Sequence, residues 1–151
     1  MDDAGRRLEL KLGFDRVRTL IADRCSTDYA AGRVESEEVS TDPSVIRRRL
    51  QLTDEMRLIL MFEETFPTSG YIDCLHFLEP IGKNASIDLL SLGRLRTMLD
   101  TLRRVTGFFR GMKDGIYPAL KQMAAGFPGF PEVQRRIDGI LDKYGEIKDT
   151  A

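Results

Sequence analysis

Apolar residues at helical spacing divide the first half of the chain into three predicted helices. The first covers about 13–24, and a short second helix starts from a cap at Ser26 or Thr27. Asp42 and Pro43 form a further start signal, because aspartate caps free N–H groups and proline suits the first helical position. A long helix is therefore predicted from Pro43 to about Glu64.

The segment 66–85 shows no sustained period. Its apolar residues are interrupted by Pro67, Gly70, Pro80 and Gly82, which prevent a long helix. We expect a loop with one short helical turn that packs onto the core.

The clearest pattern follows. Five apolar residues form a seam at alternating three- and four-residue steps, with Thr106 in the slot before the last of them: Leu92, Leu95, Leu99, Leu102 and Phe109. Such a seam predicts a long amphipathic helix over 88–111, roughly 36 Å long at about 1.5 Å per residue. Prolines then open two shorter helices, over about 118–125 and 131–143, and 144–149 is typical of a helix stop followed by a strand or turn.

These elements predict an all-α fold: an irregular helical bundle with one or two long amphipathic helices and a short extended C-terminal segment. The whole of 1–151 is expected to form one helical core region. The pattern also allows a subdivision into 1–66 and 86–144 around the loop-rich 66–85.

Composition adds a cellular location. The chain has 151 residues, of which 42% are hydrophobic and 31% charged, as in ordinary folded proteins. The sequence has no run of eighteen apolar residues, so no membrane span is predicted, and residues 1–7 lack the apolar stretch of a signal peptide. Cys25 and Cys74 are isolated, which favours free thiols over a disulfide or metal site. A cytoplasmic location is predicted.

Catalytic chemistry is not indicated. His76 is the only histidine and lies between apolar residues, where a structural role is more typical than catalysis. The sequence has no GxxxxGK[ST] phosphate loop and no His, Cys or carboxylate cluster at metal-ligand spacing. We therefore expect no catalytic, cofactor-binding or metal-binding residues here, and no enzyme activity in this segment alone.

One basic feature is a candidate nucleic-acid contact. The net charge of −1, from 23 basic and 24 acidic residues, argues against a segment that grips nucleic acid by itself. Arg96, Arg103 and Arg110 nevertheless recur every seven residues along the long helix, opposite its seam, and arginine can donate two hydrogen bonds to a phosphate. The alternative, a solvated face with salt bridges, is the favoured interpretation.

Four stretches together resemble one family. The C-terminal end, Gly145-Glu146-Ile147-Lys148-Asp149-Thr150-Ala151, resembles the Gly-Glu-Ile-x-Asp-Ser-Ala-Ser signature of the second MutS subfamily, with threonine for the first serine. LGFDRVRTLIADRCSTDYAAGRV resembles its opening helix pair. RRRLQLTDEMRLIL resembles its helix with Leu-x-x-Thr-x-Glu, at Leu50, Thr53 and Glu55. GYIDCLHFLEPIG resembles its Gly-[Ile]-x-Asp segment, at Gly70, Ile72 and Asp73.

The resemblance implies an N-terminal core or lever-like segment of a DNA-binding ATPase several times longer. Such a protein has ATP and Mg²⁺ bound at its own Walker A motif, often carries a C-terminal Smr nuclease domain, and is expected to be a homodimer. Its relatives are associated with mismatch-repair-like functions, suppression of homologous recombination through branched DNA, and rescue of collided ribosomes. Because Ala151 falls inside the signature, we expect a truncated piece rather than a natural C-terminus.

Two hypotheses follow. In the first, the segment is a non-catalytic core piece whose residues act by packing, with the arginine stripe as its candidate contact and DNA or the ribosome as its target. In the second, it is a stand-alone helical adaptor that binds a protein partner through an exposed apolar end formed by Phe108, Phe109 and Met112.

Overall fold

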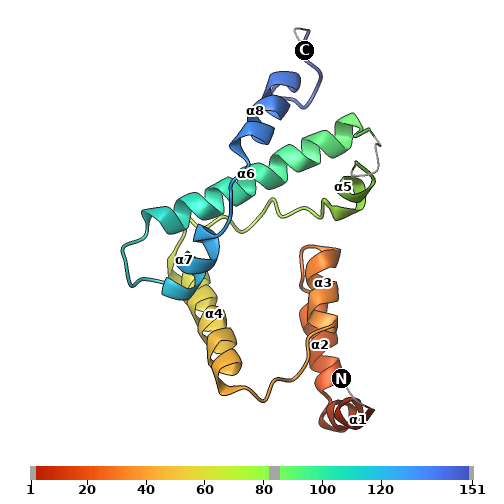
Figure 1. Cartoon of the computed structure of the whole chain (residues 1–151), viewed down its shortest axis with the longest axis vertical. Helices are drawn as coiled ribbons and strands as arrows, with labels where there is room; N and C mark the ends of the chain where they lie inside the picture. Colours follow the sequence, from red (N-terminus) through yellow and green to blue (C-terminus); the bar gives the residue numbers. More distant parts are fainter. Residues whose placement is uncertain (1–2, 82–85, 150–151) are drawn as a thin grey trace. The chain divides into compact units, whose positions relative to one another are not determined.

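A computed structural model of the chain describes residues 3–81 and 86–149, and within them it contains eight α-helices and no β-strand (Figure 1). The predicted all-α class is confirmed. Gly82, and Thr150 and Ala151 of the resembling signature, lie outside the described residues. None of the described helices is both long enough and apolar enough to cross a membrane.

The chain divides into two compact units, Met1–Thr41 and Asp42–Ala151. Residues 66–85, around which the sequence allowed a subdivision, lie inside the second unit. Each unit is described by itself.

The first unit contains α1 (Asp3–Leu12), α2 (Phe14–Ala22) and α3 (Asp28–Glu35). Helices α2 and α3 match the predicted pair, and the Thr27 side chain caps α3 by accepting a hydrogen bond from Ala30 N at 3.1 Å. Helix α1 was not predicted. Its apolar residues Leu8, Leu10 and Leu12 are two positions apart, so a helix does not gather them on one face, and all three are exposed.

The side chain of Arg18 links separate segments of the first unit. Arg18 of α2 donates hydrogen bonds to Glu9 Oε1 at 2.9 Å and to the Glu37 carbonyl at 2.6 Å, and its guanidinium lies 5.2 Å from the centre of the Phe14 ring. Glu9 is buried, whereas α2 and α3 have no buried residue. The described part of this unit is therefore held by one shielded ion pair more than by an apolar core.

The second unit is built on helices with clear start signals. Helix α4 (Pro43–Phe62) is capped by Asp42, which accepts from Ser44 N at 2.7 Å, as predicted. Helix α6 (Leu89–Gly111) is capped by Asp88, which accepts from Ser91 N at 2.9 Å. Helices α7 (Pro118–Ala125) and α8 (Pro131–Ile140) begin at their prolines.

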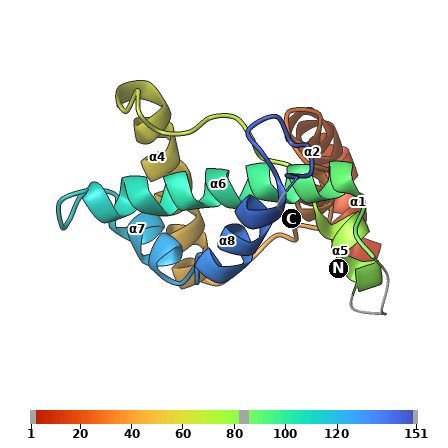
Figure 2. The same ribbon diagram turned by 90° about the horizontal axis from the view of Figure 1, so that it is seen from above.

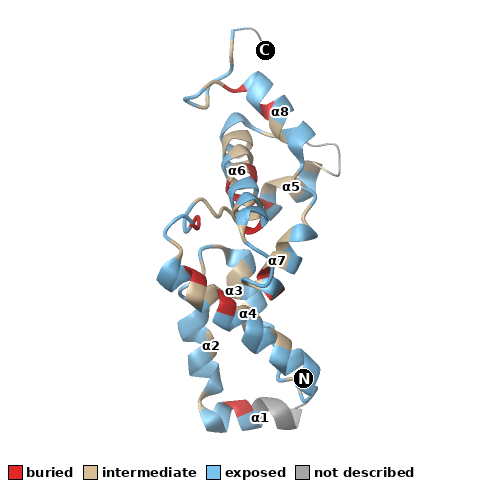
Figure 3. Cartoon of the chain, turned by 90° about the vertical axis from the view of Figure 1, so that its left-hand side faces the viewer, coloured by how far each residue is buried: buried red, intermediate tan, exposed pale blue. Residues whose placement is uncertain are grey.

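Helix α6 supplies residues to two apolar clusters. Figure 2 shows α7 and α8 beside α6, and Figure 3 shows buried residues on all three helices. Helices α4 and α6 both pack against α7, and α8 packs against α6. The first cluster has as its buried members Ile59, Phe66, Phe109 and Leu120. The second has Leu99, Ile137 and Leu141, with Leu92 and Leu95 packed on it. Helix α6 has the predicted apolar seam, but the two ends of the seam pack into different clusters.

The segment between α4 and α6 contains α5 (Leu75–Ile81), so the expected short helical turn is confirmed. Phe66 and Cys74 are buried, which anchors the segment at both ends of its loop. The Phe66 ring meets Phe108 and Phe109 edge-on, with centroids 5.1 and 6.1 Å away. This geometry is the favourable one for aromatic pairs.

Helix α8 ends at Ile140, three residues before the predicted end. Leu141 and Ile147 pair there as an isolated antiparallel bridge, and the backbone bonds Asp142 N to Glu146 O at 2.8 Å and Lys148 N to Ile140 O at 2.9 Å flank it. Of the predicted strand or turn after the helix stop, the structure has a tight turn closed by this bridge. Gly145 takes φ +85° within it, a conformation that favours glycine.

Candidate functional site

The predicted arginine stripe is divided by its contacts. Arg96 Nε lies 3.1 Å from Asp138 Oδ1, and Arg96 Nη1 donates to the Asp142 carbonyl at 2.6 Å. With its side chain only 30% exposed, Arg96 ties α6 to the end of α8. Its first role is to join two helices.

The other two members of the stripe are more open. Arg103 pairs with Asp100 one turn earlier at 2.6 Å, and both side chains remain largely exposed. Arg110 is exposed in the last turn of α6, where a positive charge interacts favourably with the helix dipole. The three arginines do not form one open surface, and phosphate contact by this stripe stays a prediction.

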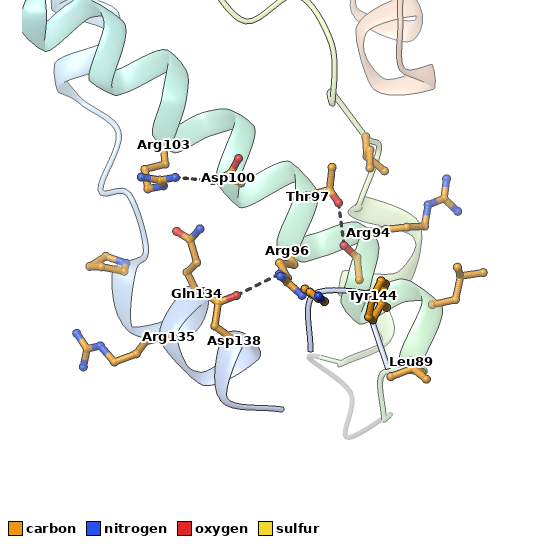
Figure 4. A pocket seen from close by; sticks show the side chains of 16 residues that line it. Leu89, Arg94, Arg96, Thr97, Asp100, Arg103, Gln134, Arg135, Asp138 and Tyr144 are labelled. Carbon is orange, nitrogen blue, oxygen red and sulfur yellow. Dashed lines mark hydrogen bonds and ion pairs between the residues drawn. The ribbon is translucent and has the colours of Figure 1, made fainter. Parts of the chain in front are cut away.

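An open groove of about 1120 Å³ lies between α6, α8 and the turn 142–145 (Figure 4). Arg96 and Arg103 line it, and Arg110 does not. Its basic side chains are Arg94, Arg96, Arg103, Arg135 and Lys143, whereas the carboxylates among its lining residues are Asp100 and Asp138. The groove is therefore locally basic on a chain whose net charge is −1.

An aromatic side chain stands in the groove. Tyr144 is 76% exposed, and Lys143 Nζ lies 4.8 Å from the centre of its ring, within the range of a cation–π contact. Leu89 and Leu90, from the first turn of α6, add exposed apolar surface to the lining. Figure 4 shows Arg96 to the left of Tyr144 and Leu89 below it.

The turn that carries Tyr144 is fixed by one carboxylate. Asp142 Oδ1 accepts from Tyr144 N at 2.8 Å and from Glu146 N at 2.9 Å. Hydrogen bonds from the backbone, Glu146 first, lower the pKa of Asp142, and the charge of Arg96 adds to the effect. The carboxylate therefore stays ionised and holds the turn against the end of α8.

Glu55, in a stretch that resembles the family, has a structural position. It lies on α4, is buried, and accepts from the backbone N–H groups of Ala119 at 3.0 Å and Leu120 at 2.8 Å. These are orphan donors at the start of α7, whose N-cap Tyr117 has φ +50° and makes no side-chain cap. Glu55 thus caps a helix more than sixty residues away.

Gly70 and Asp73 also hold structure. Gly70 has φ +86°, and a Cβ there would overlap the Thr101 Oγ1 atom, whose hydroxyl lies 3.0 Å from the Gly70 carbonyl as a donor. The Asp73 carboxylate accepts from Leu75 N at 3.0 Å at the start of α5. In this loop a glycine is needed for close approach to α6, and the aspartate starts the next helix.

The histidine and the two cysteines do not form a catalytic or metal-binding group in the described residues. No group of three or more His, Cys, Asp or Glu in the described ranges could hold a metal ion. His76 is exposed and meets Phe77 edge-on at 4.9 Å. Cys25 and Cys74 are free thiols, and burial, with Asp73 nearby, raises the pKa of Cys74.

The surface that the adaptor hypothesis needs is not open. Phe109 is buried, and Phe108 is half-buried against the first apolar cluster. The prediction that these rings form an exposed apolar end is therefore wrong, since both rings pack inward against Phe66.

The sequence did not predict that Arg135, Lys143 and Tyr144 lie in one groove with Arg94. Arg94 precedes them by 41 to 50 positions, and they meet only because α8 folds back on α6. The available signal was a glycine turn, which marked the bend without showing which side chains it would present.

Comparison with known proteins gives two relatives. The chain is 26% identical over 145 residues to the Endonuclease MutS2 of Thermomicrobium roseum and 23% identical over 141 residues to that of Pelotomaculum thermopropionicum. Each match covers 93% of this chain but 18% of the relative, so the chain spans about a fifth of the length of these curated proteins. No protein-family model and no solved structure matches it. The resemblance that the collinear motifs predict is confirmed: this chain is similar to a segment of the MutS2 endonucleases.

Proposed function

We propose that this chain is a non-catalytic scaffold segment of a longer, MutS-like DNA-binding ATPase that acts in DNA repair or in suppressing homologous recombination. ATP, Mg²⁺ and any endonuclease activity would then belong to other parts of that protein. Ribosome rescue shares this architecture and is the other target that the resemblance implies.

The observation that carries the proposal is the position of the family-like residues. Glu55 caps α7 from α4, Gly70 allows a loop to approach α6, and Gly145 shapes the turn after α8. Glu55 and Gly70 each hold one helical element against another, and of the three only Gly145 lines the groove. Residues that fix the relative positions of helices suit a segment that transmits motion between other domains.

The basic face of α6 supports a contact with nucleic acid. Phosphate groups are recognised mainly by arginine and lysine, and such binding weakens steeply with salt because counterions are released. Arg103 and Arg110 are exposed and can turn toward a phosphate, whereas Arg96 is engaged by Asp138 and Asp142. We therefore expect Arg103 and Arg110 to contribute more than Arg96.

The test is fluorescence anisotropy with a labelled four-way junction and a linear duplex at several salt concentrations. Replacing Arg103 and Arg110 by alanine should weaken binding and reduce the magnitude of the negative slope of log K against log salt by about 0.9 for each phosphate that is no longer neutralised. Arg57→Ala is the matched control, because Arg57 forms the same i,i+3 pair with Asp54 on α4 at similar exposure.

Two results count against the proposal in different ways. Equal reductions in affinity in the Arg103/Arg110 variant and in the Arg57 control would remove the stripe as a specific contact. No binding of either DNA at low salt would remove nucleic-acid contact by this segment and leave only its packing role.

A further inference from the structure

The groove between α6 and α8 contains cations that the fold does not neutralise. Arg96, Arg103 and Arg135 each pair with a carboxylate, at 3.1, 2.6 and 2.6 Å. Among the described residues, Arg94 and Lys143 have no carboxylate partner within ion-pair distance, and both are exposed. Two unmatched cations on opposite elements of one groove favour a ligand that carries repeated negative charge.

The aromatic ring beside them is exposed but not loose. Tyr144 stands on a turn whose backbone is bonded to Asp142 Oδ1 and whose base is anchored by Leu141, which is buried in the second apolar cluster. Lys143 Nζ lies against the ring, which leaves its remaining surface to solvent. A pinned, exposed ring is prepared to stack on a planar group.

We propose that this groove binds single-stranded nucleic acid, with a base stacked on Tyr144 and the neighbouring phosphates on Arg94 and Lys143. Aromatic rings set in a basic groove are the usual means of binding single strands, because stacking does not depend on the base and the cations follow the backbone. A duplex hides its base faces inside the stack, so it has phosphates for Arg94 and Lys143 but no face for Tyr144.

The inference rests on the proposed function and deepens it, since it names the form of nucleic acid and residues outside the arginine stripe. An unpaired strand is also the feature that separates a branched or frayed structure from linear duplex. The groove would therefore recognise the single-stranded part of such a substrate.

The experiment measures anisotropy of fluorescent dT20 and of a 20-base-pair duplex on addition of the full chain. We expect Tyr144→Ala to weaken dT20 binding by about 5-fold or more, the range found when one stacking ring is removed. Tyr144→Phe should retain binding, because it keeps the ring. Duplex binding should be unchanged in both variants.

Two further variants give independent readouts. Arg94→Gln with Lys143→Gln should reduce the magnitude of the negative slope of log K against log salt for dT20 by about 0.7 for each phosphate that is no longer neutralised. Tyr29→Ala is the control: Tyr29 is also an exposed tyrosine but lies in the first unit, so its replacement should leave dT20 binding unchanged. Because Tyr144 is exposed, its variants should keep the helical circular dichroism of the wild-type chain.

The outcomes separate the two proposals. Equal binding of dT20 and duplex with no effect of Tyr144→Ala would overturn the groove assignment and leave the proposed function standing. No binding of any nucleic acid would overturn both. Binding of poly-glutamate that competes with dT20 and is equally weakened by Tyr144→Ala would assign the groove to acidic protein segments and overturn the inference.

Discussion

Replacement of Glu55 tests how α4 and α7 are joined. Its carboxylate accepts from Ala119 N and Leu120 N at 3.0 and 2.8 Å and from Gln51 Nε2 at 2.9 Å, and the residue is only 7% exposed. Glu55→Ala would leave two buried N–H groups without an acceptor at the start of a helix that has no other side-chain cap.

The magnitude follows from those contacts. Each hydrogen bond to a charged acceptor contributes about 1.5–3 kcal/mol, and a carboxylate at a helix N-terminus adds about 0.3–1 kcal/mol. Part of this is offset because burying the charge of Glu55 has its own desolvation cost. We therefore expect Glu55→Ala to lower the free energy of unfolding of the second unit by about 3–4 kcal/mol, and Glu55→Gln by roughly half as much.

The assay is urea unfolding followed by circular dichroism at 222 nm. Asp54→Ala is the control, because Asp54 is the neighbouring acid on α4 and its exposed pair with Arg57 should contribute less than about 1 kcal/mol. A destabilisation by Glu55→Ala no larger than that of the control would refute the capping role. So would a full destabilisation by Glu55→Gln accompanied by no change in amide exchange of α7.

Three other predictions follow from single contacts. Gly70→Ala should lower the free energy of unfolding of the second unit by about 2–3 kcal/mol. In a double-mutant cycle, adding Thr101→Ala should recover part of that loss, because it removes the hydroxyl that the new Cβ would overlap. Additive effects of the two substitutions would contradict the close approach. Folding lowers the pKa of Asp142, so the ionised carboxylate stabilises the turn fully above the ordinary pKa of 3.8, and this stabilisation is lost as the pH falls through the lowered pKa. NMR amide shifts of residues 142–147 that do not move below pH 3.8 would contradict this prediction. Arg18→Leu should loosen the first unit by about 3 kcal/mol, since it leaves Glu9 buried without its partner, and unchanged amide protection in 7–37 would contradict this.

Local signals predicted most of the fold. Asp42 with Pro43, Thr27, Pro118 and Pro131 mark helix starts that the structure confirms, because capping and proline geometry depend only on neighbouring residues. The apolar seam of α6 could also be predicted, since side chains on one face of a helix recur about every 3.6 residues.

The rest depended on contacts between distant residues. In the sequence, Glu55 is one more acid on a helix, and only the fold brings the N–H groups of α7 against it. The expected stripe assumed that arginines opposite the seam face solvent, whereas the fold of α8 engages Arg96 and leaves Arg103 in a groove. The exposure of Tyr144 likewise follows from how a turn is pinned, and spacing alone carries no such information.

Binding of a single strand in the groove is tested most directly by an NMR titration of the isotopically labelled chain, at low salt, with a branched DNA that has a single-stranded arm. We expect amide shift changes along the groove-facing turns of α6, the start of α8 and the turn 142–145, and these changes should revert when salt is raised. We expect none around Glu55 and the start of α7, where residues act by packing. Shift changes confined to α4 and α7, or no changes at all, would show that the groove does not bind the strand.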